Sequence, residues 1–293
     1  ACGMGQDFYE QTETGKRIFD KATELMGFSM PQLCFEENDR LDITEYTQAA
    51  MVTASIAMMR VLEENGIKPD VAAGLSLGEY CALAAAGVMS DEDAIRTVRQ
   101  RGILMQEAVP VGEGAMAAIL ALDASAIEEV TGAMEGVWIA NYNCPGQIVI
   151  SGEKAAVEDA CEKLKAAGAK RAVMLNVSGP FHSGMLADAG EKLGEVLSQV
   201  ELHEPQIPYV ANVTAQYVKN AAEVKELLTR QVSSSVRWQQ SVEAMIADGV
   251  DTFIEIGPGK TLAGFMRKIS RDVKTLNVEK LEDISKVAEA LKS

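Results

Sequence analysis

The order of apolar and polar positions divides the chain into alternating helices and strands. Segments in which apolar residues recur every three or four positions are 7–26, 43–66, 77–87, 90–109, 123–134, 153–167, 185–200, 221–232, 236–248, a segment after Gly259 and one at the end of the chain. Short β-branched runs predict strands at 71–73, 115–120, 137–142, 147–151, 170–177, 207–212, 252–256 and 275–278. Such alternation is typical of an α/β protein with a mainly parallel sheet.

Residues 113–179 follow a different order from the rest of the chain. Their pattern is β-α-β-β-α-β, which is the split motif of ferredoxin-like domains. Gly112 and Gly114 stand before it, and the pair Gly179-Pro180 follows it. We therefore expect a small subdomain at 113–179, inserted into a larger α/β domain formed by 1–112 and 180–293.

Composition and charge narrow the functional classes. Hydrophobic residues make up 47% of the chain, which suits a packed core, and no apolar run approaches the ~20 residues of a membrane span. The chain has 27 basic and 43 acidic residues, and the resulting net charge of −16 argues against nucleic-acid binding. The five cysteines are scattered without a C-x-x-C pair, which predicts neither a disulfide framework nor a metal site. We expect a cytoplasmic protein that binds neither membranes nor nucleic acid.

The stretch "GLSLGEY" places Ser76 between a predicted strand and a predicted helix. G-x-S-x-G in this setting is the nucleophile elbow, in which Gly74 and Gly78 remove side chains that would collide with neighbouring backbone. The N–H of Leu77 would then be one donor of an oxyanion hole. The alternative is a tight turn without chemistry.

A nucleophilic serine needs a base, which is usually histidine. Of the two histidines, His203 lies among Glu201, Glu204 and Pro205, in what we expect to be a solvated connection. His182 follows a predicted strand at a crossover to a helix, where the sites of α/β folds collect. We expect His182 to be the base, oriented by a backbone carbonyl or an amide; a purely structural histidine is the alternative.

Arg101 lies on the apolar face of the helix predicted at 90–109. It shares this face with Ala94, Val98 and Met105, whereas Arg96 shares a polar face with acidic residues. A buried guanidinium requires an anion or several carbonyls. It would therefore either bind a substrate carboxylate through two hydrogen bonds or form a structural ion pair.

Together these stretches resemble malonyl-CoA:acyl-carrier-protein transacylases of type II fatty acid synthesis. The matching segments cover essentially the whole chain and are "GLSLGEY", "RGILMQEAVPVGEGAMAAI", "NYNCPGQIVISG", "AGAKRA", "GPFHSGML", "RQVSSSVRW" and "FIEIGPGKTLAG". The resemblance implies an α/β-hydrolase-like core with a ferredoxin-like subdomain. It also implies acyl transfer from malonyl-CoA to the carrier protein through a malonyl-serine, by a monomer without a metal or a bound cofactor.

The resemblance assigns a role to each site residue. Ser76 resembles the acyl-accepting serine, His182 the general base, and Arg101 the arginine that pairs with the malonyl carboxylate. Gln231 resembles the residue whose backbone carbonyl orients the histidine. The positions that resemble the pocket lining are Met105, Asn143 and Asn212. The basic residues that could meet an acidic carrier protein are Lys170, Arg171, Arg267 and Lys268.

The chain departs from the family at two places. Leu75 stands where the family elbow often has histidine. Members also open with an apolar strand and a G-Q-G-x-Q loop, whose glutamine would supply the second oxyanion donor, and the printed sequence starts after that point. We expect it to be a fragment, or an incompletely recorded sequence, of an active enzyme. The other hypotheses are a serine esterase or thioesterase, an inactive acyl-binding scaffold and an acyltransferase module of a polyketide synthase.

Overall fold

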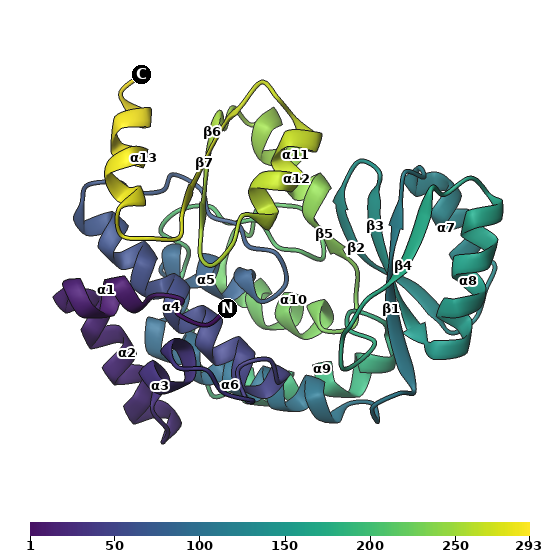
Figure 1. Ribbon diagram of the computed structural model, residues 1–293, viewed down its shortest axis with the longest axis horizontal. Helices are drawn as coiled ribbons and strands as arrows, with labels where there is room; N and C mark the ends of the chain where they lie inside the picture. The colour runs from purple at the N-terminus through teal and green to yellow at the C-terminus, as the bar shows by residue number, and fades with distance from the viewer. The chain divides into compact units, whose positions relative to one another are not determined.

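The computed structural model describes residues 1–293, which separate into two compact units (Figure 1). The first unit contains residues 1–102, 200–209 and 249–293, and the second contains 103–199 and 210–248. Each unit combines helices with strands.

Helices dominate the first unit. They are α1 (Gln6–Gln11), α2 (Glu13–Met26), α3 (Met30–Phe35), α4 (Thr44–Glu64), α5 (Gly78–Ala85), the first part of α6 (Asp91–Glu107), α12 (Thr261–Ile269) and α13 (Asp283–Leu291). Strands β6 (Thr252–Ile256) and β7 (Lys274–Val278) pair in parallel. Helix α4 is apolar on most of its surface and is buried, as expected for such a helix, with α1, α2 and α3 against it (Figure 1).

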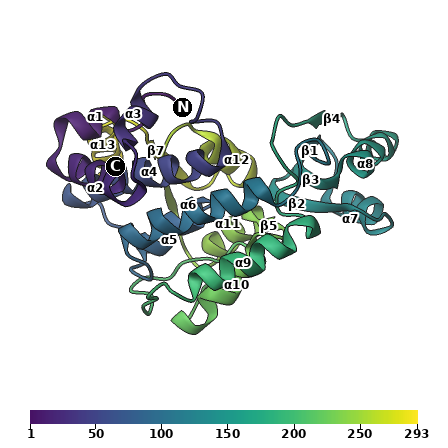
Figure 2. The same cartoon turned by 90° about the horizontal axis from the view of Figure 1, so that it is seen from below.

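A five-stranded sheet forms the centre of the second unit. In chain order, the elements of the second unit after α6 are β1 (Gly114–Leu120), α7 (Ala124–Gly132), β2 (Val137–Cys144), β3 (Gln147–Glu153), α8 (Lys154–Ala166), β4 (Arg171–Met174), η1 (Gly184–Leu186), α9 (Ala187–Leu197), η2 (Ala221–Glu223), α10 (Val224–Gln231), β5 (Val236–Arg237) and α11 (Trp238–Ala247). The strand order is β4-β1-β3-β2-β5. The first four strands are antiparallel, whereas β5 runs parallel to β2. Helices α9 and α10 lie side by side (Figure 2).

The two faces of this sheet bury different partners. Apolar residues of α7 and α8, among them Ile127, Val157 and Leu164, cover one face. On the other face Met116, Ala140 and Val149 form a separate cluster, against which Phe181 packs. Because Phe181 directly precedes His182, this second face fixes part of the segment that carries the histidine.

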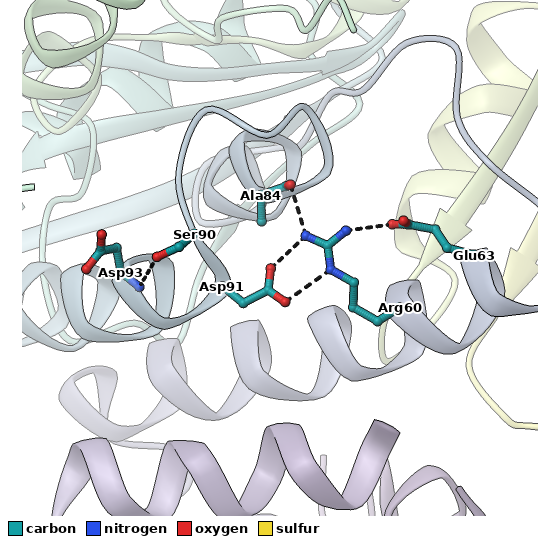
Figure 3. A network of polar contacts seen from close by, with 6 residues as sticks. All are labelled: Arg60, Glu63, Ala84, Ser90, Asp91 and Asp93. Carbon is teal, nitrogen blue, oxygen red and sulfur yellow. Dashed lines mark hydrogen bonds and ion pairs between the residues drawn. The ribbon is translucent and has the colours of Figure 1, made fainter. Parts of the chain in front are cut away.

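A polar clamp joins α4, α5 and α6 in the first unit (Figure 3). Nε and Nη2 of Arg60, on α4, donate to the two carboxylate oxygens of Asp91 at 3.1 and 2.7 Å. The same guanidinium donates to Glu63 at 2.9 Å and to the carbonyl of Ala84, on α5, at 3.1 Å. Ser90 Oγ accepts the N–H of Asp93 at 3.1 Å, which confirms Ser90 as the predicted start of the α6 helix.

Some predicted elements differ from the observed ones. The helix predicted at 7–26 breaks at Thr12, which is extended and whose Oγ accepts the N–H of Gly15 as the cap of α2. Helix α3 was not predicted, because its six residues are too few to show a period. The predicted strands at 71–73 and 207–212 meet only at one parallel bridge between Ala72 and Tyr209. Pro208 lacks an N–H group and therefore limits this ladder.

The antiparallel order β4-β1-β3-β2, with α7 and α8 on one face, is that of the ferredoxin-like motif. All six of these elements lie within 113–179. We keep 113–179 as the proposed subdomain and 1–112 with 180–293 as the proposed catalytic domain. The second unit extends beyond the proposed subdomain to include 103–112, 180–199 and 210–248.

Candidate active site

Ser76 occupies a strained turn in the first unit. Its φ angle is 55°, a left-handed conformation that is uncommon for residues other than glycine. Helix α5 begins two residues later, and the amides of Gly78, Glu79 and Tyr80 bond back to carbonyls of the turn. The N–H of Leu77 has no acceptor within the chain. This amide is therefore available at the start of the helix, as the oxyanion prediction requires.

The two glycines of the elbow have different functions. A Cβ atom at Gly74 would lie 1.9 Å from the carbonyl oxygen of Gly78, so only glycine fits at position 74. At Gly78 a Cβ atom would meet no atom within 4 Å. The prediction of a collision is confirmed at position 74 and is wrong at position 78, because the side chain there would point into open space.

Arg101 lies against the serine. Its side chain is 1% exposed, and Nη2 donates to Ser76 Oγ at 3.2 Å while Nη1 donates to Gln48 Oε1 at 2.8 Å. Burial lowers the pKa of the Arg101 guanidinium, whereas the neighbouring Tyr80 and Glu79 raise it. The guanidinium carbon lies 5.7 Å from the centre of the Tyr80 ring. The structure therefore places a buried cation one hydrogen bond from the candidate nucleophile.

The sequence did not single out three of these neighbours. Gln48 is a buried amide on α4, between Thr47 and the run Ala49-Ala50, and its only signal was a polar residue in an apolar helix. Glu79 and Tyr80 are 1% and 0% exposed and belong to the quoted elbow stretch, where we assigned them no role.

His182 is held in a turn of the second unit. Its φ angle is 59°, also left-handed, and its side chain is 4% exposed. Nδ1 lies 2.8 Å from the carbonyl oxygen of Gln231, at the end of α10. Since a carbonyl oxygen can only accept a hydrogen bond, Nδ1 carries the proton and Nε2 keeps its lone pair. The second nitrogen is therefore the one that can act as a base.

Gln231 is itself fixed by a buried neighbour. Its side-chain Nε2 donates to Oδ1 of Asn212 at 3.2 Å, and both residues are 0% exposed. Next to the histidine, Ser183 Oγ donates to the carbonyl of Pro180 at 2.6 Å. These bonds link three of the predicted site residues, His182, Gln231 and Asn212, in one chain of contacts.

The other predicted residues lie on or next to α6, β2, β4 and α12. Met105 is 5% exposed and lies one turn after Arg101 on α6, and Asn143 is 7% exposed on β2. Lys170 and Arg171 lie exposed at the start of β4, whereas Arg267 and Lys268 lie exposed in the last turn of α12. His203 has a side chain that is 54% exposed, as predicted for a solvated connection.

Comparison with known proteins decides the family. Residues 2–286 match the family described as the acyl transferase domain. The chain belongs to this acyl transferase family. It is 49% identical to a malonyl CoA-acyl carrier protein transacylase of Bacillus subtilis over an alignment of 295 residues. The alignment covers 99% of this chain and 93% of that protein.

Solved acyl transferases have the same fold. The malonyl CoA-acyl carrier protein transacylase of Clostridium perfringens is 42% identical with a TM-score of 0.96, over 100% of this chain and 93% of that one. A malonyl-transacylase solved with the acyl-carrier protein of a type II polyketide synthase is 39% identical with a TM-score of 0.95, over 99% of this chain and 96% of that one. The predicted α/β fold class and the predicted family are confirmed.

Two features are absent from this acyl transferase. No group of three or more histidine, cysteine, aspartate or glutamate side chains is arranged to hold a metal ion, and the five cysteines are free. None of the helices combines the length and the apolar surface that crossing a membrane requires.

Proposed function

We propose that this acyl transferase moves a malonyl group from malonyl-CoA to the phosphopantetheine thiol of an acyl carrier protein, through a malonyl-Ser76 intermediate. The observation that carries the proposal is the hydrogen bond from the buried Arg101 guanidinium to Ser76 Oγ. A single CH2 group separates the free carboxylate of a malonyl group from its thioester carbonyl. A malonyl group on Ser76 would therefore bring that carboxylate within reach of the guanidinium.

In the first half-reaction Ser76 Oγ attacks the thioester carbonyl of malonyl-CoA while His182 Nε2 takes its proton. The oxyanion binds the N–H of Leu77, and the carbon–sulfur bond breaks as the thiolate of coenzyme A leaves with the proton from His182. The Gln231 carbonyl would stabilise the charged imidazole because Nδ1 donates to it.

The second half-reaction reverses these steps. The thiol of the carrier protein gives its proton to His182 and attacks the malonyl ester, and Ser76 Oγ leaves and recovers the proton. The groups named in these two half-reactions are side chains and backbone groups of the protein, so the proposed reaction uses neither a metal nor a bound cofactor, and one copy of the chain provides them.

The acyl pocket would include Met105, Asn143 and Asn212. Asn143 Oδ1 is buried without a hydrogen-bond partner in the structure, so a bound acyl-CoA could satisfy it. We further propose that the exposed basic residues of β4 and α12 meet the carrier protein. The relatives do not favour the esterase and scaffold alternatives.

Initial rates with malonyl-CoA and holo carrier protein test the proposal. Double-reciprocal plots should give parallel lines, as a covalent intermediate requires, and acetyl-CoA should be a poor donor. Intersecting lines would contradict the covalent route. Release of malonate at the same rate with and without carrier protein would instead support an esterase.

A further inference from the structure

The segment 179–185 carries His182 and is called the histidine loop below. Resting on the function proposed above, we infer that the sheet face opposite α7 and α8 positions the catalytic histidine. We assign Gly114 on β1 and Trp138 on β2 as positioning residues that act through this loop. The whole arrangement lies within the second unit.

The first contact joins Gly114 to Pro180. A Cβ atom at position 114 would lie 2.5 Å from both Cδ and Cγ of Pro180 and 2.7 Å from its Cβ. The proline ring is rigid and cannot rotate away, so a larger residue at 114 must move the loop two residues before His182. Gly114 is not among the glycines with positive φ, so its backbone would accept alanine.

The second contact joins Gly184 to Trp138. A Cβ atom at position 184 would lie 2.6 Å from Cζ2 of the indole, which itself is 38% exposed. Gly184 also has no positive φ, so the indole is the obstacle to a side chain there. Between the two contacts, Phe181 packs against the cluster of Met116, Ala140 and Val149. Pro180, Phe181 and Gly184 of the loop thus rest on one sheet face.

The conformation of His182 explains why such support is needed. A left-handed conformation is unfavourable for a residue other than glycine and persists only where its surroundings fix it. The direction of Nε2 depends on this turn. Because misplacing a catalytic group by 1 Å can cost roughly 10²-fold in rate, the packing of the loop should control proton transfer.

The experiment measures the rate at which malonyl-CoA acylates Ser76 in Gly114→Ala and Gly184→Ala. We expect each rate to fall about 10- to 100-fold, with the KM for malonyl-CoA and the melting temperature close to those of the wild type. Gly132→Ala is the matched control, since a Cβ atom at the end of α7 would meet no atom within 4 Å. It should acylate at the wild-type rate.

Two double-mutant cycles distinguish a positioning role from a general disruption of the structure. In a Trp138→Ala background, Gly184→Ala should cost nothing further, because the obstructing indole is gone. In a His182→Ala background, Gly114→Ala should not lower the residual rate, because its effect passes through the imidazole. If Gly114→Ala fails to fold, the Trp138–Gly184 cycle still tests whether the sheet face positions His182.

The outcomes separate this inference from the proposed function. If Gly184→Ala acylates like the wild type, or if losses persist in the His182→Ala background, the positioning role is overturned. If the wild-type protein takes no acyl group from malonyl-CoA, the proposed function fails instead.

Discussion

Backbone strain is concentrated at the candidate catalytic residues. Only four residues other than glycine have positive φ angles, and two of them are Ser76 and His182; the others are Ala121 and Ala215. Strained residues persist where the surrounding structure fixes them, and they gather at sites where a side chain must be aimed. This supports an active role for both residues over the alternatives of a plain turn and a structural histidine.

Arg101→Ala is the prediction at the scale of one residue. Losing a hydrogen bond to a charged group costs about 1.5–3 kcal/mol, so malonyl transfer should fall roughly 10- to 150-fold while acetyl transfer falls less. Transfer rates from both donors measure this. Arg96→Ala is the control, because Arg96 lies on the same helix with a side chain 51% exposed beside Glu92 and Asp93. Unchanged malonyl preference in Arg101→Ala would remove the assigned role.

At the scale of elements, three helices hold Ser76 and its neighbours in the first unit. Gln48 lies on α4, Ser76 just before α5, and Arg101 on α6. The Arg60 clamp links the same three helices (Figure 3). Burial by itself lowers the pKa of the Arg60 guanidinium, but hydrogen bonds and charge from Asp91, with Glu63, outweigh it and raise that pKa. The clamp therefore keeps its charge and fixes the helices relative to one another.

Arg60→Ala should loosen this arrangement. We expect the free energy of unfolding to fall by about 1.5–3 kcal/mol, because Asp91 loses two charged hydrogen bonds, and acylation of Ser76 to slow with it. Urea unfolding and acylation rates measure the two effects. Arg17→Ala, at an exposed position of α2, is the control. Equal stability of the two variants would show that the clamp does not hold the helices.

Much of the fold and of the site could be predicted, because it depends on patterns of residues close together in the sequence. Contacts between residues far apart in the sequence could not be predicted. The elbow at Ser76 depends on neighbours such as Gly74, and strand 252–256 has a clear pattern, so both were predicted. Gln48 was missed because it approaches Arg101 from 53 positions away. The contact of Gly184 with Trp138 likewise joins distant segments, and neither residue shows it in sequence.

At the scale of the whole molecule, we expect the charge of the chain to affect how it associates with a carrier protein. The chain carries a net charge of −16, so an acidic carrier protein would be repelled except at local basic sites. Lys170 and Arg171 are exposed at β4, an edge strand, and Arg267 and Lys268 are exposed on α12. Such groups steer association more than they change chemistry at the site.

Reversing the charge of Lys170 and Arg171 to glutamate should therefore raise the KM for the carrier protein several-fold and leave that for malonyl-CoA unchanged. Steady-state transfer assays measure both constants. The same reversal of Lys163 and Lys165, which are exposed on α8 and paired with Asp159 and Glu162, is the control. Equal increases in both constants, or an equal effect in the control, would exclude a docking role for this pair.

The most direct test of the account is the intact mass of the protein after mixing with malonyl-CoA, followed by peptide mapping of the adduct. We predict the gain of one malonyl group on Ser76, no gain in Ser76→Ala, and loss of the group when holo carrier protein is added. A protein that gains no mass, or that carries the malonyl group on another residue, would contradict it.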